Sequence, residues 1–158
     1  MIRFVMSVLF LLSVSLPVSA ACYSRAEVSA EQGLRIHSEL MQIGLNCMEI
    51  LRQPNLYNNY RQFTKQNSHV INGWENTMTS YFARSNGGNG QRDFHDFRTR
   101  IANEVSSSAA RMRPDVFCHN HVKRLNSAMV MSQQDVVQWA SASGGQLPSR
   151  PLCASASR

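Results

Sequence analysis

Apolar residues recur at helical spacing in several stretches of the chain, and no stretch alternates as strands do. The first such stretch begins at Ser24, which forms a capping-box pattern with Glu27, and ends before Pro54. One face of this predicted helix carries Leu34, His37, Leu40, Met41, Gly44, Leu45, Met48 and Leu51. The charged residues Glu31, Arg35 and Glu39, spaced four apart, are expected on the solvent side.

A second helix is predicted from Pro54 or Asn55 up to the loop at 85–90, which is rich in glycine and asparagine. Its face is strongly aromatic and carries Tyr57, Tyr60, Phe63, Val70, Trp74, Met78, Tyr81 and Phe82. Most of these side chains are expected in the core, although Tyr57, Tyr60, Trp74 and Tyr81 could also line a groove. Gly73 weakens the helix locally and is expected to allow close packing opposite Trp74.

A third helix is predicted from Asp93 to Pro114, because apolar residues follow one another at steps of three or four. Beyond Pro114 the weaker pattern indicates a turn and a short helix. Ser132 can then cap a further short helix, in which Met131 and Val136 have the spacing of a hydrophobic staple. An extended tail is expected from about residue 145. The predicted fold is all-α: a disulfide-stapled antiparallel helical bundle of three longer helices plus one or two short C-terminal helices.

The chain has four cysteines, and this even number suggests that they form disulfides in an oxidising compartment. Four cysteines allow three pairings. In an up-down-up bundle, Cys47 near the end of the first helix and Cys118 after the third fall at one end, whereas Cys22 and Cys153 fall at the other. This topology predicts the disulfides Cys47–Cys118 and Cys22–Cys153, each typically worth about 2–4 kcal/mol.

The first 20 residues have the pattern of a secretory signal peptide. Arg3 supplies a positive start, an apolar run extends over 4–16, and Val18-Ser19-Ala20 offers small residues to a signal peptidase. The apolar run is too short for a membrane span. Ser19 stands where a lipoprotein signal usually has leucine, so lipidation at Cys22 is not favoured. Cleavage after Ala20 would leave a single domain, 21–158, periplasmic or secreted and without a transmembrane span.

The chain is moderately basic, with a formal net charge of +6 that becomes +5 once Arg3 is removed. A basic surface can attract anionic components of a cell envelope, whereas export makes nucleic acid an unsuitable native partner. Basic residues gather around Cys118, where an anionic group could dock; the alternative is a solvated basic surface. They are Arg111, Arg113, Lys123 and Arg124.

The histidines suggest three kinds of chemistry. His119 and His121 resemble a metal site, but their neighbour Cys118 is expected in a disulfide and the ligand set is incomplete. His37 lies on the apolar stripe, where a buried, hydrogen-bonded role is favoured. His95 and Asp96 are adjacent on a helix and therefore point about 100° apart, which is unfavourable for acid–base catalysis. No motif for haem, di-iron, zinc protease, serine hydrolase or phosphate binding is present, and no cofactor is expected.

Several strings of the mature chain resemble small secreted four-cysteine helical proteins encoded by alphaproteobacteria. They are 34–41, 44–47, 94–103, 113–118 and 150–153. The resemblance covers most of the mature chain and implies export and a four-cysteine framework, but it carries over no catalytic residue.

These observations predict an exported, non-enzymatic helical protein that binds an envelope protein or an anionic envelope component, or has a structural role there. One alternative is a small hydrolase acting on the envelope, with His37 or His95 paired to a carboxylate from another helix. A second is a weak metal binder at His119 and His121.

Overall fold

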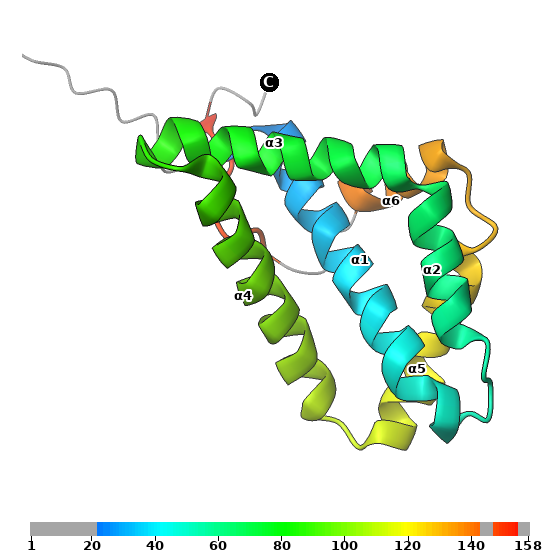
Figure 1. The fold of residues 1–158 in the computed structure, drawn as a ribbon. Coiled ribbons are helices and arrows are strands. Elements are labelled where there is room, and N and C mark those ends of the chain that lie inside the picture. Colours follow the sequence, from blue (N-terminus) through cyan, green and yellow to red (C-terminus); the bar gives the residue numbers. More distant parts are fainter. Residues whose placement is uncertain (1–21, 143–146, 155–158) are drawn as a thin grey trace, which may run out of the picture.

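The computed structural model describes residues 22–142 and 147–154, so the predicted signal peptide lies outside the described residues. Within them the chain forms six helices and, apart from one isolated bridge between Tyr23 and Leu152, no β structure (Figure 1). The helices are α1 (Arg25–Ile50), α2 (Leu56–Gln66), α3 (Ser68–Asn86), α4 (Gly90–Ala110), α5 (Pro114–Ala128) and α6 (Gln133–Ala142). None of the helices in this part of the chain combines the length and apolarity needed to cross a membrane.

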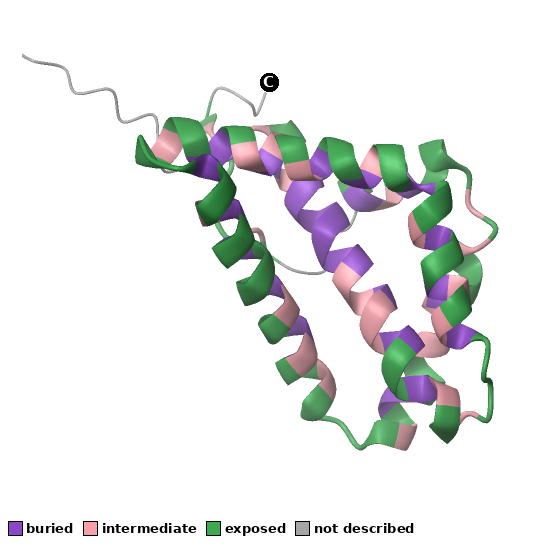
Figure 2. Ribbon diagram, in the orientation of Figure 1, coloured by how far each residue is buried: buried purple, intermediate pink, exposed green. Residues whose placement is uncertain are grey.

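Helix α1 is the centre of the bundle, in contact with all five other helices. Its start is fixed by the predicted capping box: Ser24 Oγ accepts from the Glu27 amide at 3.3 Å, and Glu27 Oε2 accepts from the Ser24 amide at 2.7 Å. Figure 2 shows buried positions running through its N-terminal half. The expectation of a solvated side at Glu31 and Arg35 is therefore wrong, because both residues are buried.

The second predicted helix is in fact two helices, which meet at the buried residue Asn67. The Asn67 side chain donates to the carbonyl oxygen of Phe63 at 3.0 Å, and its backbone leaves the helical region with φ −106° and ψ 16°. The break turns the chain, so that α3 crosses near the N-terminal end of α1 while α2 lies along its C-terminal half (Figure 1). The aromatic residues of α2 and α3, which are too many for one helix face, therefore reach the core from two directions.

Gly33 of α1, and not Gly73, provides the close approach to Trp74. A methyl group at Gly33 would lie 2.5 Å from the Trp74 ring atoms Cδ2 and Cε2, whereas one at Gly73 would have no neighbour within 4 Å. The indole therefore rests directly on the backbone of α1.

The later helices follow the predicted pattern more closely. Phe94, Phe97, Ile101 and Val105 of α4 are buried, as their spacing predicts. The helix begins at Gly90, three residues before the expected Asp93, and its cap Asn89 accepts from the Arg92 amide at 3.2 Å. Pro114 begins a full helix, α5, because proline fits the first turn. Ser132 precedes α6 as predicted, and its hydroxyl accepts from the Asp135 amide at 3.2 Å.

Both predicted disulfides are present. Cys47 at the end of α1 joins Cys118 in α5, and Cys22 joins Cys153, with Cα–Cα distances of 5.4 and 5.0 Å. The C-terminal segment 147–153 returns to the start of α1, where the Tyr23 amide donates to the carbonyl of Pro151 at 2.8 Å. The all-α, disulfide-stapled bundle is therefore confirmed, with six helices in the described residues.

Candidate ligand pocket

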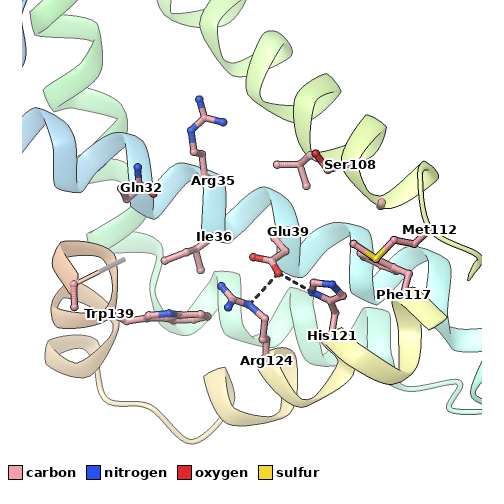
Figure 3. Close-up of a pocket in the computed structure, with 13 residues that line it drawn as sticks. Gln32, Arg35, Ile36, Glu39, Ser108, Met112, Phe117, His121, Arg124 and Trp139 are labelled. Carbon is pink, nitrogen blue, oxygen red and sulfur yellow. Dashed lines mark hydrogen bonds and ion pairs between the residues drawn. The ribbon is translucent and has the colours of Figure 1, made fainter. Parts of the chain in front are cut away.

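A pocket of about 540 Å³ lies between α1, α4, α5 and α6 (Figure 3). This volume is in the range that holds a small organic ligand. Seven of its lining residues are apolar or aromatic and six are polar or charged; they are Gln32, Arg35, Ile36, Glu39, Val105, Ser108, Ala109, Met112, Phe117, His121, Arg124, Trp139 and Ala142.

The apolar wall comes from side chains that the bundle brings together from distant parts of the sequence. Ile36 of α1 is almost fully buried, Val105 and Ala109 belong to α4, and Trp139 belongs to α6. Met112, just after α4, remains 40% exposed at the edge of the pocket. A ligand placed here would transfer apolar surface out of water against this wall.

Glu39 is the central polar residue of the pocket. Its Oε1 lies 3.2 Å from His121 Nδ1 and 2.9 Å from Arg124 Nε, as the dashed lines in Figure 3 mark. The His121 ring stacks on Phe117 with a centroid distance of 4.6 Å, and the Arg124 guanidinium lies 5.1 Å from the centre of the Trp139 ring. One carboxylate of α1 thus orients two side chains of α5, one of which also contacts α6.

Arg35 forms the second polar group, on the side facing α4. Its guanidinium donates to Glu31 Oε1 at 2.9 Å and to Glu104 Oε2 at 2.7 Å. Burial lowers the pKa of Arg35, but the hydrogen bonds that its guanidinium donates to Glu104 and Glu31 outweigh this effect, so the pKa is raised above its usual value. Arg35 is therefore a permanent cation whose charge is balanced by neighbouring carboxylates.

Glu31 is fully buried and also binds the C-terminal segment. The amide and hydroxyl of Ser149 donate to Glu31 Oε1 at 3.0 and 2.8 Å. Burial, followed by the negative charge of Glu31, raises the pKa of the Tyr23 phenol well above its ordinary value. The buried carboxylate thus connects both disulfide-bonded ends of the domain to α1.

The structure places the four predicted anion-binding residues in different surroundings. Arg124 lines the pocket but is paired with Glu39, and Arg113 pairs with Asp115 at 2.8 Å. Arg111 lines a neighbouring hollow beside α4, and Lys123 is exposed on α5. An anion site built from all four residues therefore remains a prediction.

The two histidines proposed as metal ligands have separate partners. His119 Nδ1 donates to the carbonyl of Asp115 at 2.8 Å, whereas His121 lies against Glu39. Cys118 is oxidised. Within the described part of the chain, no group of three or more histidine, cysteine, aspartate or glutamate side chains is placed to hold a metal ion.

The other histidines named as candidate catalysts lie outside the pocket. His37 is buried, with Nε2 3.0 Å from Thr64 Oγ1 and 3.1 Å from the Tyr60 hydroxyl, so it is the hydrogen-bonded core histidine that the sequence predicts. Burial and the charge of Arg98 lower the pKa of His37 to about 4. His95 is exposed on α4, with its Nε2 3.3 Å from Gln91 Nε2. Among the described residues, neither histidine bonds to a carboxylate.

Sequence reasoning missed the residues that define the pocket, above all Glu39, Ile36 and Trp139. The residue types alone are a weak indication of a pocket, because a carboxylate four residues after an arginine is also typical of a solvated helix face. Comparison of the chain with models of known protein families, with curated proteins and with solved structures found no match. Function therefore rests on the chemistry of the pocket.

Proposed function

We propose that the chain is an exported, non-enzymatic binding protein whose pocket between α1, α4, α5 and α6 holds a small ligand with a mainly apolar body. The observation that carries this proposal is the combination of an apolar wall with polar groups already oriented by one another. Binding sites for small molecules have this composition, with a few placed polar groups among apolar side chains.

The pairing within the pocket supports binding over catalysis. Arg35 is balanced by Glu31 and Glu104, and Glu39 is balanced by Arg124. Such pairs hold the side chains in fixed positions, so less side-chain conformational entropy is lost when a ligand binds.

Export is supported by the signal-peptide pattern of residues 1–20 and by the two disulfides. The resemblance to small secreted four-cysteine proteins supports it as well. We expect the exported chain to begin at Ala21, which N-terminal sequencing of material from an envelope fraction would test. Recovery of the chain with residues 1–20 still attached would contradict the proposed cleavage.

The binding proposal can be tested with N-phenyl-1-naphthylamine, a neutral apolar dye that fluoresces when it leaves water. The disulfide-bonded protein should give a saturable increase in fluorescence with one site per chain. Replacing Ala109, which lines the pocket, by phenylalanine should weaken dye binding by about tenfold or more, since the ring occupies part of the cavity.

The matched control is Ala110→Phe, because Ala110 is the next residue of α4 and is exposed. This variant should bind the dye as the unsubstituted protein does. Binding that does not saturate, or equal loss in both variants, would show that the dye is not held in this pocket.

A hydrolase is the second candidate, because His121 and Glu39 form a histidine–carboxylate pair in the pocket. Such a pair can orient a general base, although Glu39 is also held by Arg124. Hydrolysis of p-nitrophenyl acetate above the background rate, abolished in His121→Ala but not in His119→Ala, would favour this candidate over simple binding.

A further inference from the structure

We propose that the ligand of this pocket carries a primary ammonium group, which binds to Glu39 while its apolar body lies against the wall of α1 and α4. This inference rests on the proposed binding function and names the chemical class of the ligand. It concerns a different site from the four basic residues that the sequence suggested for anions, and shares only Arg124 with them.

The formal charges around the pocket favour a cationic ligand. The ionised side chains that line it, together with their direct partners, are three carboxylates, Glu31, Glu39 and Glu104, and two guanidiniums, Arg35 and Arg124. With His121 counted as neutral, the group carries one net negative charge within a chain whose formal charge is +6. A ligand with one positive charge would complete the balance.

The exposed charges around the pocket contribute least to its field. Arg100 and Arg111 of the neighbouring hollow are exposed and Glu104 is 47% exposed, so water and salt screen all three. Glu39 is only 22% exposed, so its field is screened much less.

Glu39 offers one carboxylate oxygen, Oε2, to a ligand. His121 and Arg124 both approach Oε1, and no donor among the described residues bonds to Oε2. Figure 3 shows Glu39 at the centre of the lining side chains, with both dashed lines ending on one oxygen. A carboxylate oxygen only accepts hydrogen bonds, and the strongest donor it can receive is a charged N–H group.

An anionic ligand at Arg35 is disfavoured. The Arg35 guanidinium donates to Glu31 and Glu104, so an anion bound there would have to displace a carboxylate that is already placed and leave it without its counter-charge. Arg124 approaches Glu39 through Nε, so an anion at its other nitrogens would lie beside the Glu39 carboxylate and be repelled by it.

The apolar wall specifies the rest of the ligand. Ile36, Val105, Ala109 and Met112 line the same pocket as Glu39, so a hydrocarbon or aromatic body attached to the ammonium group would lie against them. A bare inorganic cation would leave this wall unused. The ligand class is therefore an apolar amine.

Three probes of similar shape test the inference: 2-(1-naphthyl)ethylamine, 2-(1-naphthyl)ethanol and 3-(1-naphthyl)propanoate. Equilibrium dialysis at neutral pH measures the affinity of the disulfide-bonded protein for each. The amine should bind about tenfold more tightly than the alcohol, as a charge-assisted hydrogen bond exceeds a neutral one. The propanoate should bind most weakly.

Glu39→Gln should abolish the preference for the amine over the alcohol, because the side chain keeps its shape but loses its charge. The matched control is Glu49→Gln, on the exposed side of the same helix, which should keep the preference. If Glu39→Gln fails to fold, the relative affinities of the unsubstituted protein for the three probes still test the inference.

The outcomes separate the two proposals. Equal binding of amine and alcohol, or tighter binding of the propanoate, would overturn the ammonium inference and leave the binding function in place. If none of the three probes and no dye binds, the binding function is refuted and the inference with it.

Discussion

Replacing Gly33 by alanine tests how closely Trp74 packs against the backbone of α1. The added methyl group would lie 2.5 Å from two ring atoms of Trp74, closer than carbon atoms can approach. The indole is only 8% exposed and has little room to move away. The helix or the ring must therefore shift.

Two opposing effects set the expected size of the change. Alanine is favoured over glycine inside a helix by about 1 kcal/mol, which would stabilise the variant. Inserting a methyl group into a packed core costs typically about 1–3 kcal/mol. Because the added methyl group would overlap the Trp74 ring, we expect a packing cost in the upper part of that range. After the gain in helix propensity is subtracted, the free energy of unfolding should fall by about 1–2 kcal/mol.

Gly73→Ala is the matched control, since it has the same chemistry without a neighbour within 4 Å. Only the helix-propensity gain of about 1 kcal/mol should remain, so the two variants should change stability in opposite directions. Urea unfolding followed by far-UV circular dichroism measures both. A Gly33→Ala protein as stable as the unsubstituted one, or a loss in Gly73→Ala, would refute the packing argument.

Three further predictions concern buried charge and the disulfides. Because burial lowers the pKa of His37 to about 4 in the folded protein, against 6.5 for a free imidazole, its contribution to the free energy of unfolding should fall by about 3 kcal/mol as the pH drops from 7 to 4. Urea unfolding should therefore show a weaker pH dependence in His37→Gln. Glu31→Ala should cost about 3 kcal/mol or more in thermal unfolding, since the buried Arg35 loses its fully buried partner; a drop no larger than that of Glu49→Ala would contradict this. Removal of Cys22–Cys153 by double alanine substitution should cost about 4 kcal/mol: it spans 131 residues, of which Cys47–Cys118 already closes 71, leaving a loop of about 60. An unchanged urea midpoint would count against this estimate.

Local signals explain which parts of the fold could be predicted. The start of α1 depends on Ser24 and Glu27, which are three residues apart, and the core face of α4 follows from its own spacing. The cysteine pairing needed only the order and direction of the helices, which is why it was predicted correctly.

The break at Asn67 was missed because it needs neither proline nor glycine. It depends on an asparagine side chain that bonds to the backbone one turn earlier, and many asparagines inside helices do not do so. Continuous periodicity on both sides hides the change of direction.

The pocket was missed because burial on α1 is decided by distant segments. Arg35 looks like a solvated residue in its own helix, but Glu104 and Ser149, far along the chain, cover it. Glu39 likewise acquires its role from His121 and Arg124 of α5. Such contacts have no counterpart in local spacing.

The Cys22–Cys153 disulfide makes the domain a closed covalent ring that contains the six described helices. Tension applied to the chain outside the two cysteines would pass through a single S–S bond and bypass every one of these helices. A protease that cut one peptide bond inside the ring would release no fragment. The six helices thus carry none of that tension, and they remain covalently joined after a single cut.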